Sequence, residues 1–171
     1  MILSDVDIRR AIKSGEIKFE PQITEDQIGP GSVDLTLGNE FLKMKEGLRQ
    51  RPYDLKEINI NDLFEEIISE SIVIRPNELV LAKTLEKITL SPNICGWIQG
   101  RSRYARLGIS VHVASSFLQP GISNRQVLEI INLSKIPYTL HSGMRICQVI
   151  FQRMQTKTSK PYARFGTYAK Q

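Results

Sequence analysis

Chemically versatile residues are concentrated in one stretch of the sequence, from Gly100 to Glu129. The stretch begins with a glycine followed by Arg101, Ser102 and Arg103, and a Pro-Gly turn precedes its end. Backbone amides freed by a glycine, together with arginine and serine side chains, are groups that bind phosphate oxygens. The Glu129 carboxylate has apolar neighbours, an environment suited to a general base. We interpret the two ends of this stretch as parts of one nucleotide site.

The histidines and cysteines do not form a metal-binding pattern. The sequence has two of each, His112, His141, Cys95 and Cys147, and no HxE or CxxC pattern. Both cysteines lie in apolar, strand-like runs, so we interpret them as buried, reduced thiols. The common nucleobase deaminases bind zinc through such patterns. We therefore expect no zinc site, and a hydrolytic base in this chain must then be a carboxylate.

The composition of the 171 residues, 41% hydrophobic and 24% charged, is typical of one globular domain. No apolar run approaches the length of a membrane span and the N-terminus does not resemble a signal peptide, so we expect a cytoplasmic protein without membrane association. The net charge of +5 is compatible with a nucleic acid or a phosphorylated small molecule as ligand. Because the basic residues are dispersed, we expect no nucleic-acid partner.

The elements that would position the candidate residues are mostly short strands. Ser4 and Asp7 have the spacing of a capping box, and the apolar residues that follow predict a short helix ending near Gly15. Alternating apolar residues predict two strands over 32–38 and 40–45, and a short helix is expected over 62–68. Further strands are expected at 17–19, 72–74, 79–82, 88–90, 94–98, 109–113, 126–132, 138–140 and 144–151, with a helix-like segment at 101–106. This spacing indicates a mainly β barrel or sandwich.

The C-terminal segment, residues 155–171, differs in composition from the strands before it. It is polar and basic, yet it contains Tyr162, Phe165 and Tyr168. Aromatic side chains in a polar segment suggest that the segment docks on another surface. We treat residues 1–171 as one domain with this docking tail.

An ordered set of motifs makes the sequence resemble the deoxycytidine triphosphate (dCTP) deaminase family. The motifs are PGSVDLTLG at 30–38, GRS at 100–102, ARLG at 105–108, HV at 112–113, PG at 120–121, VLE at 127–129, GMRICQ at 143–148 and PY at 161–162. The resemblance runs from Met1 to the tail, with matched spacing between the two central motifs. It implies the distorted, jelly-roll-like β-barrel of the deoxyuridine triphosphatases (dUTPases), assembled as a homotrimer whose sites are shared between neighbouring subunits.

The resemblance also implies roles for single residues. Glu129 matches the general base that activates water for attack on C4 of cytosine, Arg106 the arginine that keeps this carboxylate ionised, and Ser102 a serine that positions the water. His112 lies in the adjoining strand. The implied substrate-binding residues are Arg101, Arg103, Ser115, Gln119, Val127, Tyr162, Tyr168 and Gln171, of which the last three belong to a tail that closes over the nucleotide. Mg²⁺ is expected to enter bound to the triphosphate rather than in a protein cage.

Three residues depart from the family's pattern. Gln119 stands where the family usually has an aspartate, Arg103 replaces a serine, and Asn124 replaces a glycine. An amide cannot act as a base, so Gln119 argues against dUTPase activity, while Glu129 is retained. We therefore expect zinc-independent hydrolysis of dCTP to dUTP and ammonia.

Two other functions stay open: a dUTPase or bifunctional enzyme, and a noncatalytic regulator that binds nucleotides. Each candidate residue also has a structural interpretation when it is considered alone. Glu129 could be a strand carboxylate paired for stability, GRS a surface turn, and His112 a core histidine with its hydrogen bonds satisfied. The joint occurrence of the motifs in one order favours the enzyme.

Overall fold

The computed structural model describes residues 1–48 and 51–168. Within this part of the chain, nine strands form one sheet and two form a smaller sheet. The strands are β1 (Ile17–Glu20), β2 (Val33–Met44), β3 (Phe64–Ile68), β4 (Ser71–Ile74), β5 (Leu79–Leu90), β6 (Ile94–Gly100), β7 (Ile109–Ser110), β8 (Phe117–Leu118), β9 (Ser123–Asn132), β10 (Tyr138–His141) and β11 (Arg145–Arg153). The helical segments are α1 (Asp5–Lys13), η1 (Glu25–Gln27), α2 (Ile60–Leu63), α3 (Ser102–Ala105) and α4 (Tyr162–Phe165).

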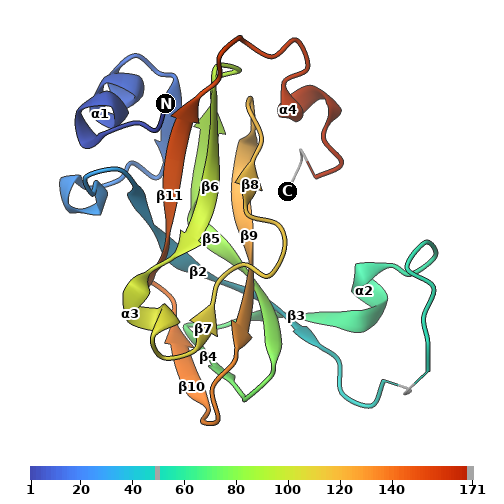
Figure 1. The fold of residues 1–171 in the computed structure, drawn as a ribbon. Coiled ribbons are helices and arrows are strands. Elements are labelled where there is room, and N and C mark those ends of the chain that lie inside the picture. The colour runs from blue at the N-terminus through green and yellow to red at the C-terminus, as the bar shows by residue number, and fades with distance from the viewer. Residues whose placement is uncertain (49–50, 169–171) are drawn as a thin grey trace.

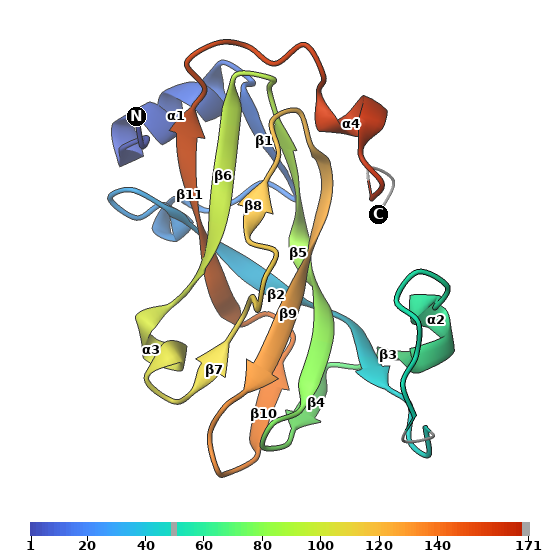
Figure 2. The same ribbon diagram turned by 45° about the vertical axis from the view of Figure 1, so that its right-hand side comes forward.

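The large sheet curls into an open barrel (Figures 1 and 2). Its strand order is β7-β9-β5-β2-β11-β6-β8, with β1 paired to β5 and β3 to β2. Every pair of neighbouring strands is antiparallel. Strands β10 and β4 form the smaller sheet. The predicted mainly β fold with a short N-terminal helix is thus confirmed. Among the described residues, no helix is both long enough and apolar enough to cross a membrane.

Alternating side chains fill the barrel. Along β5 every second residue from Val80 to Leu90 is buried, while the residues between them are at least partly exposed. This period of two is the expected pattern for a strand with one face in the core. The largest fully buried side chains include Phe41 and Phe151.

Helix α1 begins and ends as the sequence predicts. The Ser4 hydroxyl accepts a hydrogen bond from the backbone N–H of Asp7 at 3.3 Å, and the Asp7 carboxylate accepts one from the Ser4 backbone N–H, which completes a capping box. Ile8 and Ala11 are buried against the barrel. Gly15 follows the helix with a φ of +76°, a conformation that favours glycine.

Two pairs of predicted strands are single long strands in the structure. Strand β2 continues through Gly38, and a Cβ atom there would lie 2.7 Å from Arg125 Nη2, so this glycine permits close packing rather than a turn. Strand β5 continues through Glu86, which occupies an inward position and is only 3% exposed. Its carboxylate accepts hydrogen bonds from the Thr36 N–H at 2.9 Å and the Gln27 amide at 3.0 Å. A polar residue interrupts the apolar pattern of the sequence without interrupting the strand.

Other boundaries also differ from the predictions. The helix expected over 62–68 is a short helix at 60–63 followed by β3. The strand expected over 109–113 covers only 109–110, and the residues after it form the loop that leads to β8. That loop is important for the site because its main chain contacts Glu129.

Candidate active site

The carboxylate of Glu129 is held by the main chain of a neighbouring loop. Its Oε2 atom accepts hydrogen bonds from the backbone N–H groups of Val113 at 2.7 Å, Ala114 at 2.8 Å and Ser115 at 3.3 Å. Burial, the largest single influence, raises the pKa of Glu129, but these hydrogen bonds and the nearby His112 together lower it below the ordinary value of 4.5. The loop therefore holds an ionised carboxylate at neutral pH.

A cavity of about 360 Å³ lies beside this carboxylate. It is bordered by β8, by β9 and by the C-terminal segment, and it contains both apolar and amide side chains. Strand β8 pairs with β6, and β9 pairs with β5, so the two strands border the cavity without pairing with each other. Six residues predicted from the sequence line it: Ser115, Gln119, Val127, Glu129, Tyr162 and Tyr168.

The C-terminal segment covers part of this cavity. The N–H groups of Tyr162 and Ala163 donate to the carbonyls of Pro120 and Gly121, each at 3.0 Å. Gly121 has a φ of +78°, and a Cβ atom there would lie 2.5 Å from the Cβ of Pro161, so this contact requires glycine. The predicted binding residue Gln171 lies outside the described residues.

The predicted phosphate-binding residues lie elsewhere. Arg101 Nη2 is 3.0 Å from Asp34 Oδ2, and its Nη1 donates to the carbonyl of Arg145 at 2.8 Å. Ser102, Arg103 and Arg106 are exposed on or just after α3. Helices α3 and α4 lie at opposite ends of the molecule in both views (Figures 1 and 2).

Among the described residues, Arg101, Ser102, Arg103 and Arg106 do not line the cavity that contains Glu129, so the structure does not bring the two ends of the stretch from Gly100 to Glu129 together at that cavity within one chain. In the part of the chain that the structure describes, the hydrogen-bond partners of Glu129 are backbone amides, and Arg106 forms no ion pair with it. The amides already provide the stabilisation of the charged form that the sequence assigned to Arg106.

The sequence did not reveal several groups that contribute to the site. The amides of residues 113–115 are main-chain donors and carry no side-chain signature. Asn124 and Gln126 line the cavity from β9, and Ile60 reaches it from α2. In the sequence, Asn124 differs from the family pattern, which has a glycine at this position, but nothing else indicates that it lines the cavity.

The histidine and cysteine interpretations have different outcomes. Nδ1 of His112 is buried and has no hydrogen-bond partner among the described residues, so the interpretation of His112 as a satisfied core histidine is wrong. Cys95 and Cys147 are both buried and free, as predicted. Burial raises the pKa of both thiols, which disfavours the reactive thiolate.

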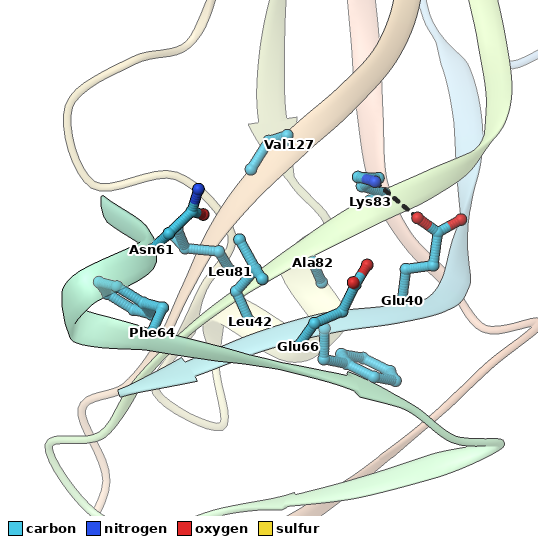
Figure 3. A pocket seen from close by; sticks show the side chains of 10 residues that line it. Glu40, Leu42, Asn61, Phe64, Glu66, Leu81, Ala82, Lys83 and Val127 are labelled. Atoms are coloured by element: carbon cyan, nitrogen blue, oxygen red, sulfur yellow. Dashed lines mark hydrogen bonds and ion pairs between the residues drawn. The ribbon is translucent and has the colours of Figure 1, made fainter. Parts of the chain in front are cut away.

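A second cavity of about 270 Å³ shares Leu81 and Val127 with the first, and Figure 3 shows the residues that line it. Its polar wall includes Lys83 and Glu40, whose charged atoms are 2.6 Å apart. Arg125 also pairs with Glu40. Lys83 and Arg125 therefore share the single carboxylate of Glu40, and the acidic Glu66 also lines this cavity.

The described residues contain no group of three or more His, Cys, Asp or Glu side chains that could hold a metal ion. The site consists of the ionised carboxylate of Glu129, a cavity with amide and apolar walls, and an aromatic roof formed by Tyr162 and Tyr168. In an open antiparallel barrel, this combination has the size and chemistry to fit a small, partly polar ring next to a fixed carboxylate.

Comparison with known proteins identifies the family. Residues 2–154 match the family model described as dCTP deaminase-like, and this chain belongs to that family. A protein of Methanosphaera stadtmanae named "dCTP deaminase, dUMP-forming" is 38% identical over 94% of this chain and 83% of its own length. A Rhodospirillum rubrum protein named "dCTP deaminase" is 36% identical over 95% of this chain and 88% of its own length.

A solved structure confirms the fold. The 2'-deoxycytidine 5'-triphosphate deaminase of Agrobacterium tumefaciens superposes with a TM-score of 0.70 at 23% identity. The superposition covers 90% of this chain and 48% of that one.

Proposed function

We propose that this protein is an enzyme that hydrolyses the amino group of dCTP, producing dUTP and ammonia without zinc. The observation that carries the proposal is the Glu129 carboxylate, which three main-chain amides hold in an ionised form at the wall of a ring-sized cavity. The names of the related proteins support the choice of substrate.

The arrangement suits a carboxylate-based mechanism. The hydrogen bonds from the loop all go to Oε2, so Oε1 is the oxygen on which Glu129 accepts a proton from water. The resulting hydroxide adds to C4 of cytosine while Glu129 passes this proton to N3. Glu129 then takes the proton of the new C4 hydroxyl and passes it to the exocyclic nitrogen, which leaves as ammonia when the C4 carbonyl forms. A base held at close range supplies much of the acceleration of such a step.

We propose that the active unit is a homotrimer in which Ser102, Arg103 and Arg106 of one copy complete the cavity of the next. The exposure of these three residues, and their location away from the cavity of their own chain, support this arrangement. Arg101 is then a positioning residue, because its ion pair with Asp34 anchors the first residue of the loop. Magnesium enters as part of the substrate, bound to the triphosphate.

The direct test is an assay of dCTP with Mg²⁺ in which ammonia and nucleotides are both quantified. Ammonia equal to the dCTP consumed is the expected result. Binding of dCTP without any turnover would instead identify a noncatalytic regulator, and cleavage of dUTP without ammonia would identify a dUTPase.

A second candidate function is a bifunctional enzyme that continues from dUTP to dUMP. The name "dCTP deaminase, dUMP-forming" of the Methanosphaera stadtmanae relative favours it. Gln119 argues against it, because this residue lines the cavity as an amide and cannot act as a base.

We expect dUTP to be the main product of the unmodified protein, and Gln119→Asp to increase dUMP and pyrophosphate. A carboxylate at this position restores a group that can activate a second water. Chromatography of the products from dCTP and from dUTP measures both reactions. Efficient release of pyrophosphate by the unmodified protein would show that Gln119 is no obstacle to the second reaction.

The pKa of Glu129 predicts the pH dependence of the reaction. A base must be ionised, and the pKa of this carboxylate is lowered, so kcat/KM should fall on the acid side only below the ordinary glutamate value of 4.5. The same ionisation stabilises the folded state above that value and loses its effect as pH falls through the lowered pKa. A pH–rate profile restricted to conditions where circular dichroism shows the folded protein separates the two effects. An acid limb centred near neutral pH would contradict this account.

A further inference from the structure

The C-terminal segment has a second attachment point, on strand β9. The side-chain amide of Asn124 donates from Nδ2 to the carbonyl of Tyr168 at 3.2 Å. Asn124 is only 7% exposed, so water competes poorly for this bond. Gln126 Nε2 donates to Asn124 Oδ1 at 2.8 Å. Because Oδ1 accepts this hydrogen bond, the orientation of the Asn124 amide is fixed with its N–H group toward the tail.

The two ends of the segment from Tyr162 to Tyr168 contact each other. The N–H of Tyr168 donates to the Tyr162 hydroxyl at 3.3 Å. Gly166 lies against the Tyr162 ring so closely that a Cβ atom there would be 2.4 Å from ring carbons. A contact that holds Tyr168 therefore also holds the Tyr162 ring, and both tyrosines line the cavity that contains Glu129.

We propose that Asn124 is a positioning residue that fixes this aromatic roof over the cavity before any nucleotide binds. The first attachment, at Pro120 and Gly121, uses main-chain atoms only, whereas the second depends on one side chain. Glycine, which the family resemblance places at this position, has no side chain to form the bond. The roof of this chain is thus held at two points.

The consequence for catalysis rests on the proposed function. A roof that is already ordered loses less conformational freedom when the nucleotide binds, so it lowers KM. Loss of the Asn124 bond should raise KM for dCTP about two- to tenfold and change kcat much less, since the side chain acts through the roof.

Limited proteolysis of the nucleotide-free protein tests the attachment without any need for activity. Asn124→Asp keeps the shape of the side chain and removes the N–H donor. Arg164 lies between the two attachments, and trypsin should then cleave after it about two- to tenfold faster than in the unmodified protein. The reason is that the cleavage rate is proportional to the fraction of molecules in which this segment is detached. Cleavage after Lys157, which precedes both attachments, provides an internal control and should not change.

Further variants separate the attachment from general stability. Tyr168→Phe keeps the main-chain carbonyl and should leave cleavage after Arg164 unchanged, whereas Gln126→Leu should accelerate it by less than Asn124→Asp does. Unchanged cleavage after Arg164 in both Asn124→Asp and Asn124→Ala would overturn the proposal. Equal acceleration of cleavage after Arg164 and after Lys157, with a lower melting temperature, would also overturn the proposal, because it would show that Asn124 stabilises β9 and the fold in general. If the proteolysis succeeds and dCTP is not deaminated, the attachment stands and the proposed function fails.

Discussion

Glu129→Gln should lower the rate of dCTP deamination by about 10²–10⁴-fold while dCTP still binds. The glutamine oxygen can accept the same hydrogen bonds from the N–H groups of residues 113–115, so the loop keeps its conformation. An amide cannot take a proton from water, so only the chemical step is affected. Steady-state kinetics and isothermal titration with dCTP and Mg²⁺ measure the two properties separately.

Glu65→Gln provides the matched control. Glu65 is an exposed carboxylate on β3 and does not line the cavity that contains Glu129. The control protein should have the rate of the unmodified protein, which shows that loss of one negative charge is not itself responsible. Retention of more than a tenth of the activity in Glu129→Gln would mean that another group is the base.

A mixture of Arg106→Ala and Glu129→Gln subunits should regain activity that neither variant has alone. Arg106→Ala should lower deamination by about 10²-fold, because the proposed site then loses the cation that the neighbouring copy contributes. Within one chain Arg106 does not line the cavity that contains Glu129, so the proposed shared site needs Glu129 from one copy and Arg106 from the next. In a random equal mixture about a quarter of the sites are complete, which sets the expected activity.

Co-expression of the two variants, each with a different affinity tag, allows isolation of the mixed assemblies. Light scattering gives their mass, and a trimer is expected. The double variant Arg106→Ala/Glu129→Gln mixed with itself is the negative control. Mixed assemblies as inactive as their parents would show that each site is built within a single chain.

The sequence was sufficient to predict the fold class because alternation and turn residues are local signals. The capping box of Ser4 and Asp7 is local too, and it is present in the structure. The length of β5 was not predictable, because Glu86 occupies an inward position that the sequence pattern reserves for apolar residues. Its hydrogen bonds come from Gln27 and Thr36, which are remote in sequence.

The candidate site was predictable as a set of side chains but not as an arrangement. Six of the expected residues line one cavity, and their roles stay predictions. The groups that hold Glu129 are main-chain amides of the loop after β7, and of these three donors only Val113 was expected to lie in a strand. The attachment of the tail to Asn124 depends on the tertiary fold, so no local pattern could indicate it.

Deamination of dCTP in water labelled with heavy oxygen tests the central claim most directly. Hydrolysis at C4 must place one labelled oxygen on the pyrimidine ring of the product for each ammonia released. Mass spectrometry of the product and its fragments locates the label. We expect label at C4 of dUTP and none in the phosphates. Label in the phosphates with none on the ring, or unlabelled dCTP recovered intact after prolonged incubation, would contradict the account.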